Sequence, residues 1–385
     1  MRGLIVPEQD EDFTADPVEL FFDLAYVYAF SELAVRLIED PTWSGAAKAL
    51  LLFVVLWFGW STFAWAANAV SGNDRKVRAI FLLATITALP MGVSIETAFE
   101  SGGATFAISS SLIVLMSSGL NLAASEAGTE HYRAVLRFAI PSLLAITLTI
   151  IGGFLDGDAR IILWVASLVV LLLATIRAGG QQWTFRPGHF SERHGLIVLI
   201  ALGEVIAGIG LSISSSLIGD EALGGRLVVG LVGAGVLAAL MWWSYFARLA
   251  PALAHVAQGL VGKEGSRFGR DTYTYSHVPI VAGIITAAAA TEHILLNVGE
   301  PIPVEFLLMF VVGNALYFVG TTLAAYRGFG VVAFERILLI FVIAIVALIS
   351  GTWSGLAFLL VVDLVLISTL FVESRLIKES RRDLA

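Results

Sequence analysis

The sequence predicts an all-α polytopic membrane protein with about twelve transmembrane helices, arranged as two parallel six-helix repeats. Three observations support this fold class: many long apolar stretches, a biased distribution of basic residues, and a match between the two halves. A helix that spans a bilayer needs about 20 mostly apolar residues and satisfies its own backbone hydrogen bonds. Twelve such stretches fill most of the 385 residues: 17–38, 43–69, 76–99, 103–124, 132–154, 160–177, 192–215, 223–248, 275–297, 302–326, 331–350 and 353–373.

The composition agrees with this fold class. The chain is 58% hydrophobic and only 14% charged, with a mean hydropathy of +0.87, whereas soluble domains carry about 25% charged residues. The chain contains no cysteine, which excludes disulfides and thiolate metal sites. No phosphate-binding loop, nucleophile elbow or nucleic-acid motif is visible. We therefore expect no enzymatic activity, no cofactor, no metal and no nucleic-acid partner.

The basic residues predict the orientation. If the N-terminus is cytoplasmic, 19 of the 23 Lys and Arg residues fall on the inner side, and only Arg36, Lys48, Arg160 and Arg226 fall outside. Cytoplasmic loops of membrane proteins carry this excess. We predict a multi-pass protein of the cell membrane with both termini in the cytoplasm.

An internal repeat is indicated by short matches between the halves. The pentad WSTFA at 60–64 matches WSYFA at 243–247, and two pairs of glutamates align, Glu32 with Glu204 and Glu96 with Glu292. The longer connection at 249–274 accounts for the larger offset of the last pair. Six helices per half give both halves the same orientation, as in transporters with parallel repeats.

This repeat divides the chain into three parts. We predict a first six-helix repeat at 1–177, a cytoplasmic linker at 178–191, and a second repeat with a basic cytoplasmic tail at 192–385. The linker contains Gly-Gly and Pro-Gly, which favour turns and loops.

Charged residues within the predicted spans are candidate functional residues, because they are costly to insert into lipid. In the first span, Glu19 and Asp23 are four residues apart and share a helix face, whereas Glu32 lies roughly on the opposite side. In the seventh span, Glu192 and Arg193 lie at the inner boundary.

Glu204 lies about 18 Å deeper in the seventh span. Glu96 and Glu292 occupy the outer thirds of their spans, at a level similar to that of Glu32 and Glu204. Asp363 is a lone acid in the last span. We predict that Glu32 and Glu204 face the interior between the halves near the other two glutamates, and that at least one exchanges a proton near neutral pH.

Two interpretations of these acids remain open: a pathway for protons or cations, or protonated side chains that hydrogen-bond neighbouring helices. An aromatic belt at the membrane interface explains Trp57, Trp60, Trp65, Trp242 and Trp243, with a substrate cavity as the alternative. His194 and His277 stand too far from other ligands in the sequence to predict a metal site.

The segments DPVELFFDLAYVYAFSELA at 16–34, ALPMGVSIETAF at 88–99 and SERHGLIVLIALGE at 191–204 resemble signatures of the bacterial low-temperature-requirement protein A family. The resemblance extends over the whole chain in length and helix number. It implies an integral membrane protein that the family name links to growth in the cold. By motif match, the family marks Glu19, Asp23, Glu192, Arg193 and Glu204, whereas His194 replaces an expected aromatic residue.

The leading functional hypothesis is a secondary transporter of an unknown small substrate, coupled to protons or another cation. An ion channel, with the first helices of both repeats lining the pore, is the first alternative. A lipid-handling or enzymatic membrane protein is the second. The expected partners are the lipid bilayer and a small-molecule or ion substrate. A deep polar cavity would favour the transporter, a continuous axial pore the channel, and a lateral cleft the lipid-handling protein.

Overall fold

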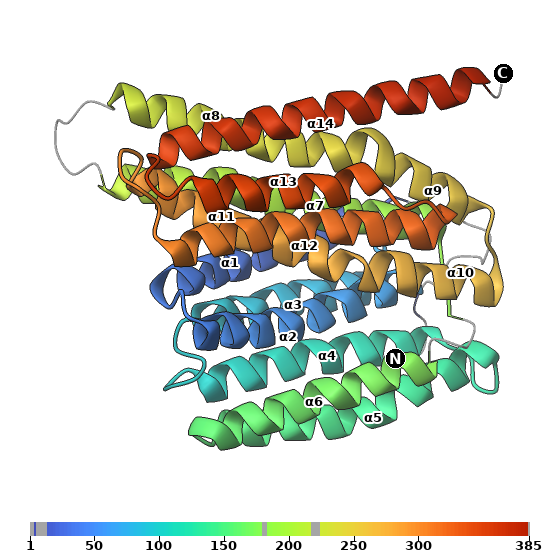
Figure 1. The fold of residues 1–385 in the computed structure, drawn as a ribbon. Coiled ribbons are helices and arrows are strands. Elements are labelled where there is room, and N and C mark those ends of the chain that lie inside the picture. The colour runs from blue at the N-terminus through green and yellow to red at the C-terminus, as the bar shows by residue number, and fades with distance from the viewer. Residues whose placement is uncertain (1–3, 5–13, 179–182, 217–223, 384–385) are drawn as a thin grey trace.

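The fold consists of long helices with roughly parallel axes, and the chain passes back and forth between the two ends of the bundle (Figure 1). The computed structural model describes residue 4 and residues 14–178, 183–216 and 224–383. The helices of the first part of the chain are α1 (Pro17–Glu39), α2 (Trp43–Ala67), α3 (Arg75–Val93), α4 (Gly103–Ala124), α5 (Glu130–Gly153) and α6 (Gly157–Ala178).

The second part contains α7 and α8, followed by helices interrupted by two π-helical segments, η1 and η2. Their bounds are α7 (Pro187–Ser216), α8 (Gly225–Ser244), η1 (Tyr245–Leu249), α9 (Ala250–Gln258), α10 (Gly262–Phe268), η2 (Gly269–Tyr275), α11 (His277–Leu296), α12 (Val304–Phe329), α13 (Phe334–Ile349) and α14 (Gly355–Asp383).

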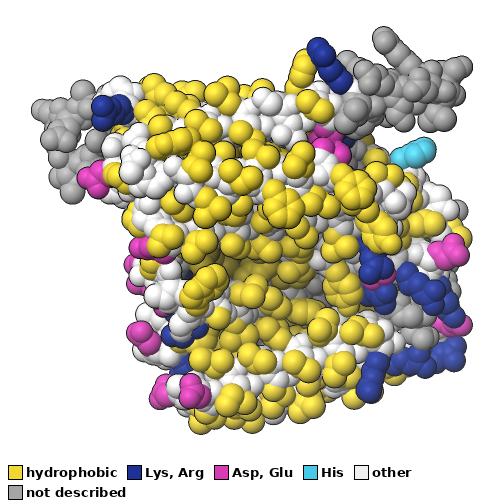
Figure 2. All heavy atoms as spheres, viewed as in Figure 1, with side chains coloured by type: hydrophobic (Ala, Val, Ile, Leu, Met, Phe, Trp, Pro, Cys, Tyr) yellow, Lys and Arg dark blue, Asp and Glu magenta, His cyan; other side chains and the backbone are white. Residues whose placement is uncertain are grey.

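The helices confirm a polytopic membrane protein. Within the described residues, ten helical stretches are long and apolar enough to cross a membrane. The other two predicted spans are also helical. α1 contains at least three acidic or basic residues in every window of 18, and α13 has only 16 residues. α1 begins and α14 ends at the same end of the bundle (Figure 1), and Figure 2 shows Lys and Arg gathered at that end.

Two predicted boundaries are wrong. The connection expected at 249–274 is mostly helical, because a helix can continue beyond the apolar layer, and α9 and α10 extend the spans on either side. α3 ends at Val93, so Glu96 lies in the connection to α4 and its side chain is exposed. The hydroxyl of Ser94 donates to the carbonyl of Met91 at 2.8 Å and helps to end α3.

The predicted linker is a short segment packed against α10. The Trp183 backbone N–H donates to the Ser266 hydroxyl at 3.0 Å, and that hydroxyl donates to the Trp183 carbonyl at 3.1 Å. α7 begins at Pro187, before the predicted span. Residues 179–182 of the linker lie outside the described residues.

Small residues bring α11 and α12 into close contact. A Cβ atom on Gly283 would lie 2.4 Å from the Tyr317 backbone nitrogen, and one on Gly313 would lie 2.5 Å from the Ala287 nitrogen. Glycines at both positions therefore allow the two backbones to approach, as small residues commonly do between membrane helices.

The predicted aromatic belt holds for only part of its members. Trp242 and Trp243 are 41% and 53% exposed, as a lipid-facing position requires, but Trp57 and Trp60 are buried. The indole N–H of Trp57 donates to the Thr274 carbonyl at 3.0 Å. A buried tryptophan needs such a partner, and the sequence pattern does not show which indoles have one.

Candidate functional site

Four charged or titratable side chains from α1 and α7 meet where both helices begin. α1 supplies Glu19 and Asp23, and α7 supplies His189 and Arg193. Each pair is separated by four residues, so its members lie one turn apart on one helix face. The two faces point at each other, and we call these four residues the charged cluster.

The start of α1 fixes Glu19. Asp16 caps the helix, Pro17 occupies its first turn, and the Glu19 carboxylate accepts from the Asp16 backbone N–H at 3.2 Å. This capping box with a proline at the first helical position is a strong start signal. The other Glu19 oxygen lies 3.0 Å from Nε2 of His189 and 3.4 Å from Nη1 of Arg193.

Asp23 receives two donors one turn further into the bundle. Its Oδ1 accepts from Nη2 of Arg193 at 2.9 Å and from Nε1 of Trp60 at 2.8 Å. The Arg193 guanidinium also lies over the Trp60 ring, 5.9 Å from its centre, within the range of a cation–π contact. All members of the charged cluster are at most 2% exposed.

Fully buried charges are usually compensated by opposite charges, but here the single arginine does not balance the acids. Two carboxylates face one guanidinium, and the fourth member, the His189 imidazole, lies beside Glu19. Asp23 Oδ2 and the Tyr26 hydroxyl are buried without a hydrogen-bond partner among the described residues. Asp23 Oδ2 can therefore accept a further hydrogen bond.

A second buried group continues from the charged cluster into the second half of the chain. The His194 ring lies 5.0 Å from the Trp60 ring and 5.3 Å from the His277 ring. Nε2 of His277 lies 2.6 Å from the Tyr245 hydroxyl. Since Nδ1 of His277 faces the Thr272 carbonyl at 3.1 Å, the tyrosine hydroxyl donates to Nε2 in the neutral imidazole.

Both π-helical segments border this second group. η1 begins with Tyr245, and η2 contains Thr272, whose carbonyl faces His277. A π-helical turn inserts an extra residue into a helix and often marks a functional site. Here each π-helical segment supplies one contact to His277, the Tyr245 hydroxyl from η1 and the Thr272 carbonyl from η2.

The other predicted residues are more scattered. Glu192 is exposed, and its carboxylate accepts from the Ala15 backbone N–H at 2.9 Å. Glu32 is half-buried and hydrogen-bonds Tyr28. Glu292 is buried in α11. The side chain of Glu204 lies outside the described residues.

Asp363 is buried between α14 and α8. It is 4% exposed, and both its carboxylate oxygens lack a hydrogen-bond partner among the described residues. A Cβ atom on Gly233 would lie 3.3 Å from one of these oxygens. The acid is therefore held against the backbone of a neighbouring helix.

Sequence reasoning missed four participants. His189 lies in the predicted linker, Trp60 was assigned to the membrane interface, and His194 and His277 were treated as isolated although their rings are neighbours. The spacing of His189 and Arg193, which repeats the spacing of the two acids in α1, was the available signal.

Within the described residues, no group of three or more His, Asp or Glu side chains could hold a metal ion.

Comparisons with known proteins agree with the sequence motifs. A family model described as "Bacterial low temperature requirement A protein (LtrA)" matches residues 14–371. A curated relative, the uncharacterized protein RA0937 of Rhizobium meliloti (strain 1021), is 28% identical over 324 residues, which cover 82% of this chain and 78% of the relative. No solved structure matches.

Proposed function

The chain is an integral membrane protein of the bacterial low temperature requirement A family, and we propose that it is a secondary transporter coupled to protons or another cation. The observation that carries the proposal is the charged cluster, buried at the contact between the first helices of the two halves. Ionisable groups inside a membrane protein are retained at a cost in stability and commonly mark transport pathways. We propose transport rather than catalysis.

The mechanism follows from the unequal charges of the cluster. A proton or cation that binds to Asp23 or Glu19 weakens the attraction of that carboxylate for Arg193. Because these contacts join α1 to α7, the bound and unbound forms favour different separations of the two helices. This linkage would couple ion binding to a movement between the halves.

The division into two parallel six-helix halves is part of the proposal. In the first half, α1 packs against α3, and in the second, α7 packs against α11. The hydroxyl of Ser117 donates to Thr62 at 2.9 Å between α4 and α2, and Ser244 lies 2.7 Å from the Tyr317 hydroxyl between α8 and α12. These pairs of contacts support the proposed repeat. The match is incomplete, because α2 packs against α4 whereas α8 packs against α14, and the tryptophans of the matching pentads differ in exposure.

We further propose that both termini are cytoplasmic. The gathering of Lys and Arg at the end where α1 begins supports this orientation (Figure 2). The charged cluster then lies near the cytoplasmic side.

Proton flux into reconstituted vesicles tests the transporter. Vesicles that contain the purified protein and a pH-sensitive dye are exposed in turn to gradients of Na⁺ and K⁺. We expect at least one gradient to change the internal pH with the wild-type protein. Asp23→Asn should abolish the change, because asparagine keeps the shape of the side chain but does not titrate. Glu32→Gln and Glu204→Gln should do the same if these acids share the pathway.

Asp156→Asn is the matched control. Asp156 is an acid paired with a buried arginine, but its side chain is 91% exposed and lies far from the charged cluster in the connection before α6. This variant should retain full flux. A folded Asp23→Asn variant as active as the wild type would refute the proposal, and a wild-type protein that moves no protons under any gradient would refute coupling to protons.

The alternatives differ in their structural support. A channel lined by the first helices of both halves needs a gap between α1 and α7, whereas Arg193 and Asp23 are in direct contact there. A lipid-handling protein is favoured by a lateral apolar groove between α1–α2 and α11–α12. We keep lipid handling as the second candidate function.

A further inference from the structure

A groove of about 510 Å³ opens on the side of the bundle between the α1–α2 and α11–α12 hairpins. Its volume is within the range of about 300–1,000 Å³ that is typical of ligand sites. Figure 2 shows a hollow surrounded by hydrophobic side chains on this face. Apolar side chains form most of its wall, among them Leu33, Leu50, Phe53, Leu308, Met309 and Leu316.

The groove runs along the spans rather than across them. On α2 its lining extends from Trp43 to Phe53, and on α12 from Val304 to Leu316. At 1.5 Å per residue these stretches are about 15–18 Å long. Both α2 and α12 are candidate spans, so the groove lies at the level of the acyl chains and opens towards them.

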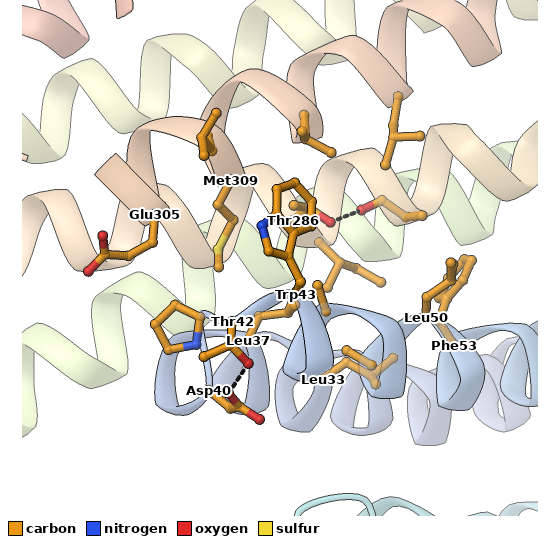
Figure 3. Close-up of a pocket in the computed structure, with 18 of the residues that line it drawn as sticks. Leu33, Leu37, Asp40, Thr42, Trp43, Leu50, Phe53, Thr286, Glu305 and Met309 are labelled. Atoms are coloured by element: carbon orange, nitrogen blue, oxygen red, sulfur yellow. Dashed lines mark hydrogen bonds between the residues drawn. The ribbon is translucent and has the colours of Figure 1, made fainter. Parts of the chain in front are cut away.

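Polar groups are concentrated at one end of the groove. Figure 3 shows Asp40 and Glu305 at this end, on the two opposing hairpins, with Leu50 and Phe53 at the other end. Asp40 accepts from the Thr42 hydroxyl at 2.6 Å. Trp43 beside them is 80% exposed, as expected for an indole at the level of the lipid headgroups.

The two carboxylates place negative charge at this mouth. Among the described residues, neither Asp40 nor Glu305 has a Lys, Arg or His nitrogen within 4.0 Å. A ligand with an apolar tail and a cationic head would match the groove and its mouth together. An anionic headgroup would be repelled by both acids.

We propose that this groove binds a membrane lipid whose headgroup carries a primary ammonium, as in phosphatidylethanolamine. One acyl chain lies between the α1–α2 and α11–α12 hairpins. The ammonium, which has three N–H donors, lies between Asp40 and Glu305. Binding of this lipid requires no flux through the protein and therefore stands apart from the proposed transport.

Native mass spectrometry of the full chain in detergent tests the proposal. The protein is titrated with phosphatidylethanolamine and with phosphatidylglycerol of the same acyl chains, and the two bound fractions are compared. The wild type should prefer phosphatidylethanolamine. The double variant Asp40→Asn/Glu305→Gln should lower this preference about tenfold, because it removes two charge-assisted contacts. Ala282→Phe, which fills the groove from α11, should lower the binding of both lipids.

Glu100→Gln/Asp158→Asn is the matched control, because it removes two exposed acids from the same end of the bundle outside the groove. This variant should keep the wild-type preference. Melting temperatures establish that each variant is folded. An unchanged preference in Asp40→Asn/Glu305→Gln, an equal loss in the control, or full lipid binding by a folded Ala282→Phe variant would overturn the proposal.

Discussion

Arg193 of α7 donates a hydrogen bond to Asp23 of α1 at 2.9 Å, and both side chains are completely buried. The two residues are 170 positions apart in the chain. Their contact joins the first helices of the two proposed halves, so its strength affects both the stability of the protein and any movement of the halves.

Removing one partner of this pair should destabilise the protein strongly. We expect Asp23→Ala to lower the free energy of unfolding by about 3–5 kcal/mol, because it leaves the Arg193 guanidinium buried without its closest countercharge. Chemical unfolding in detergent measures the loss.

The variants Asp156→Ala and Asp23→Ala/Arg193→Leu serve as controls for the buried pair. Asp156 is 91% exposed, and its partner Arg160 also donates to four backbone carbonyls. Asp156→Ala should therefore cost about 1 kcal/mol or less. The double variant should recover part of the stability lost in Asp23→Ala. Equal losses in Asp23→Ala and Asp156→Ala would show that the buried pair is not important for stability.

The indole of Trp60 should contribute more than an ordinary buried indole. Trp60 donates to the Asp23 carboxylate, whereas Trp164, which is equally buried, donates to the Thr149 carbonyl at 3.0 Å. Hydrogen bonds to charged groups are stronger than neutral ones. Trp60→Phe should therefore lower the stability by about 1 kcal/mol more than Trp164→Phe in parallel unfolding experiments. Indistinguishable losses would argue that Trp60 acts by packing alone.

Replacing Asp363 should stabilise the protein. Its carboxylate is buried without a hydrogen-bond partner among the described residues, which costs about 1–3 kcal/mol. Leucine has a similar size and removes that cost, so we expect Asp363→Leu to raise the melting temperature. Leu359→Ala, in the same contact with Gly233, should lower it. A destabilised Asp363→Leu variant would indicate a polar partner that stabilises the carboxylate.

Cysteine labelling tests the orientation without background, because the chain contains no cysteine. Asp158→Cys and Glu264→Cys place single thiols at exposed positions in the first turns of α6 and α10. In intact cells, a membrane-impermeant maleimide should label position 158 and should label position 264 only after permeabilisation. Labelling of both positions from the same side would disprove the proposed topology.

The sequence by itself determined the membrane class and most of the helices. Apolar length is sufficient for this, because a bilayer imposes the same requirement on every span. Apolar length did not predict where individual helices end. Glu96 lies beyond the end of α3, and the segment after Leu249 continues as helices, because beyond the apolar layer helix ends depend on capping and local contacts.

The sequence also determined which acids to consider, and Glu19, Asp23 and Arg193 belong to the cluster. Their partners were decided by tertiary structure alone. His189 lies in α7, and Trp60 lies in α2 at a position predicted for the membrane interface. Only the packing of α1 against α7 and α2 brings them within hydrogen-bond distance of Glu19 and Asp23. Helical periodicity specifies which face a side chain occupies, but the neighbour that meets this face depends on the arrangement of all the helices.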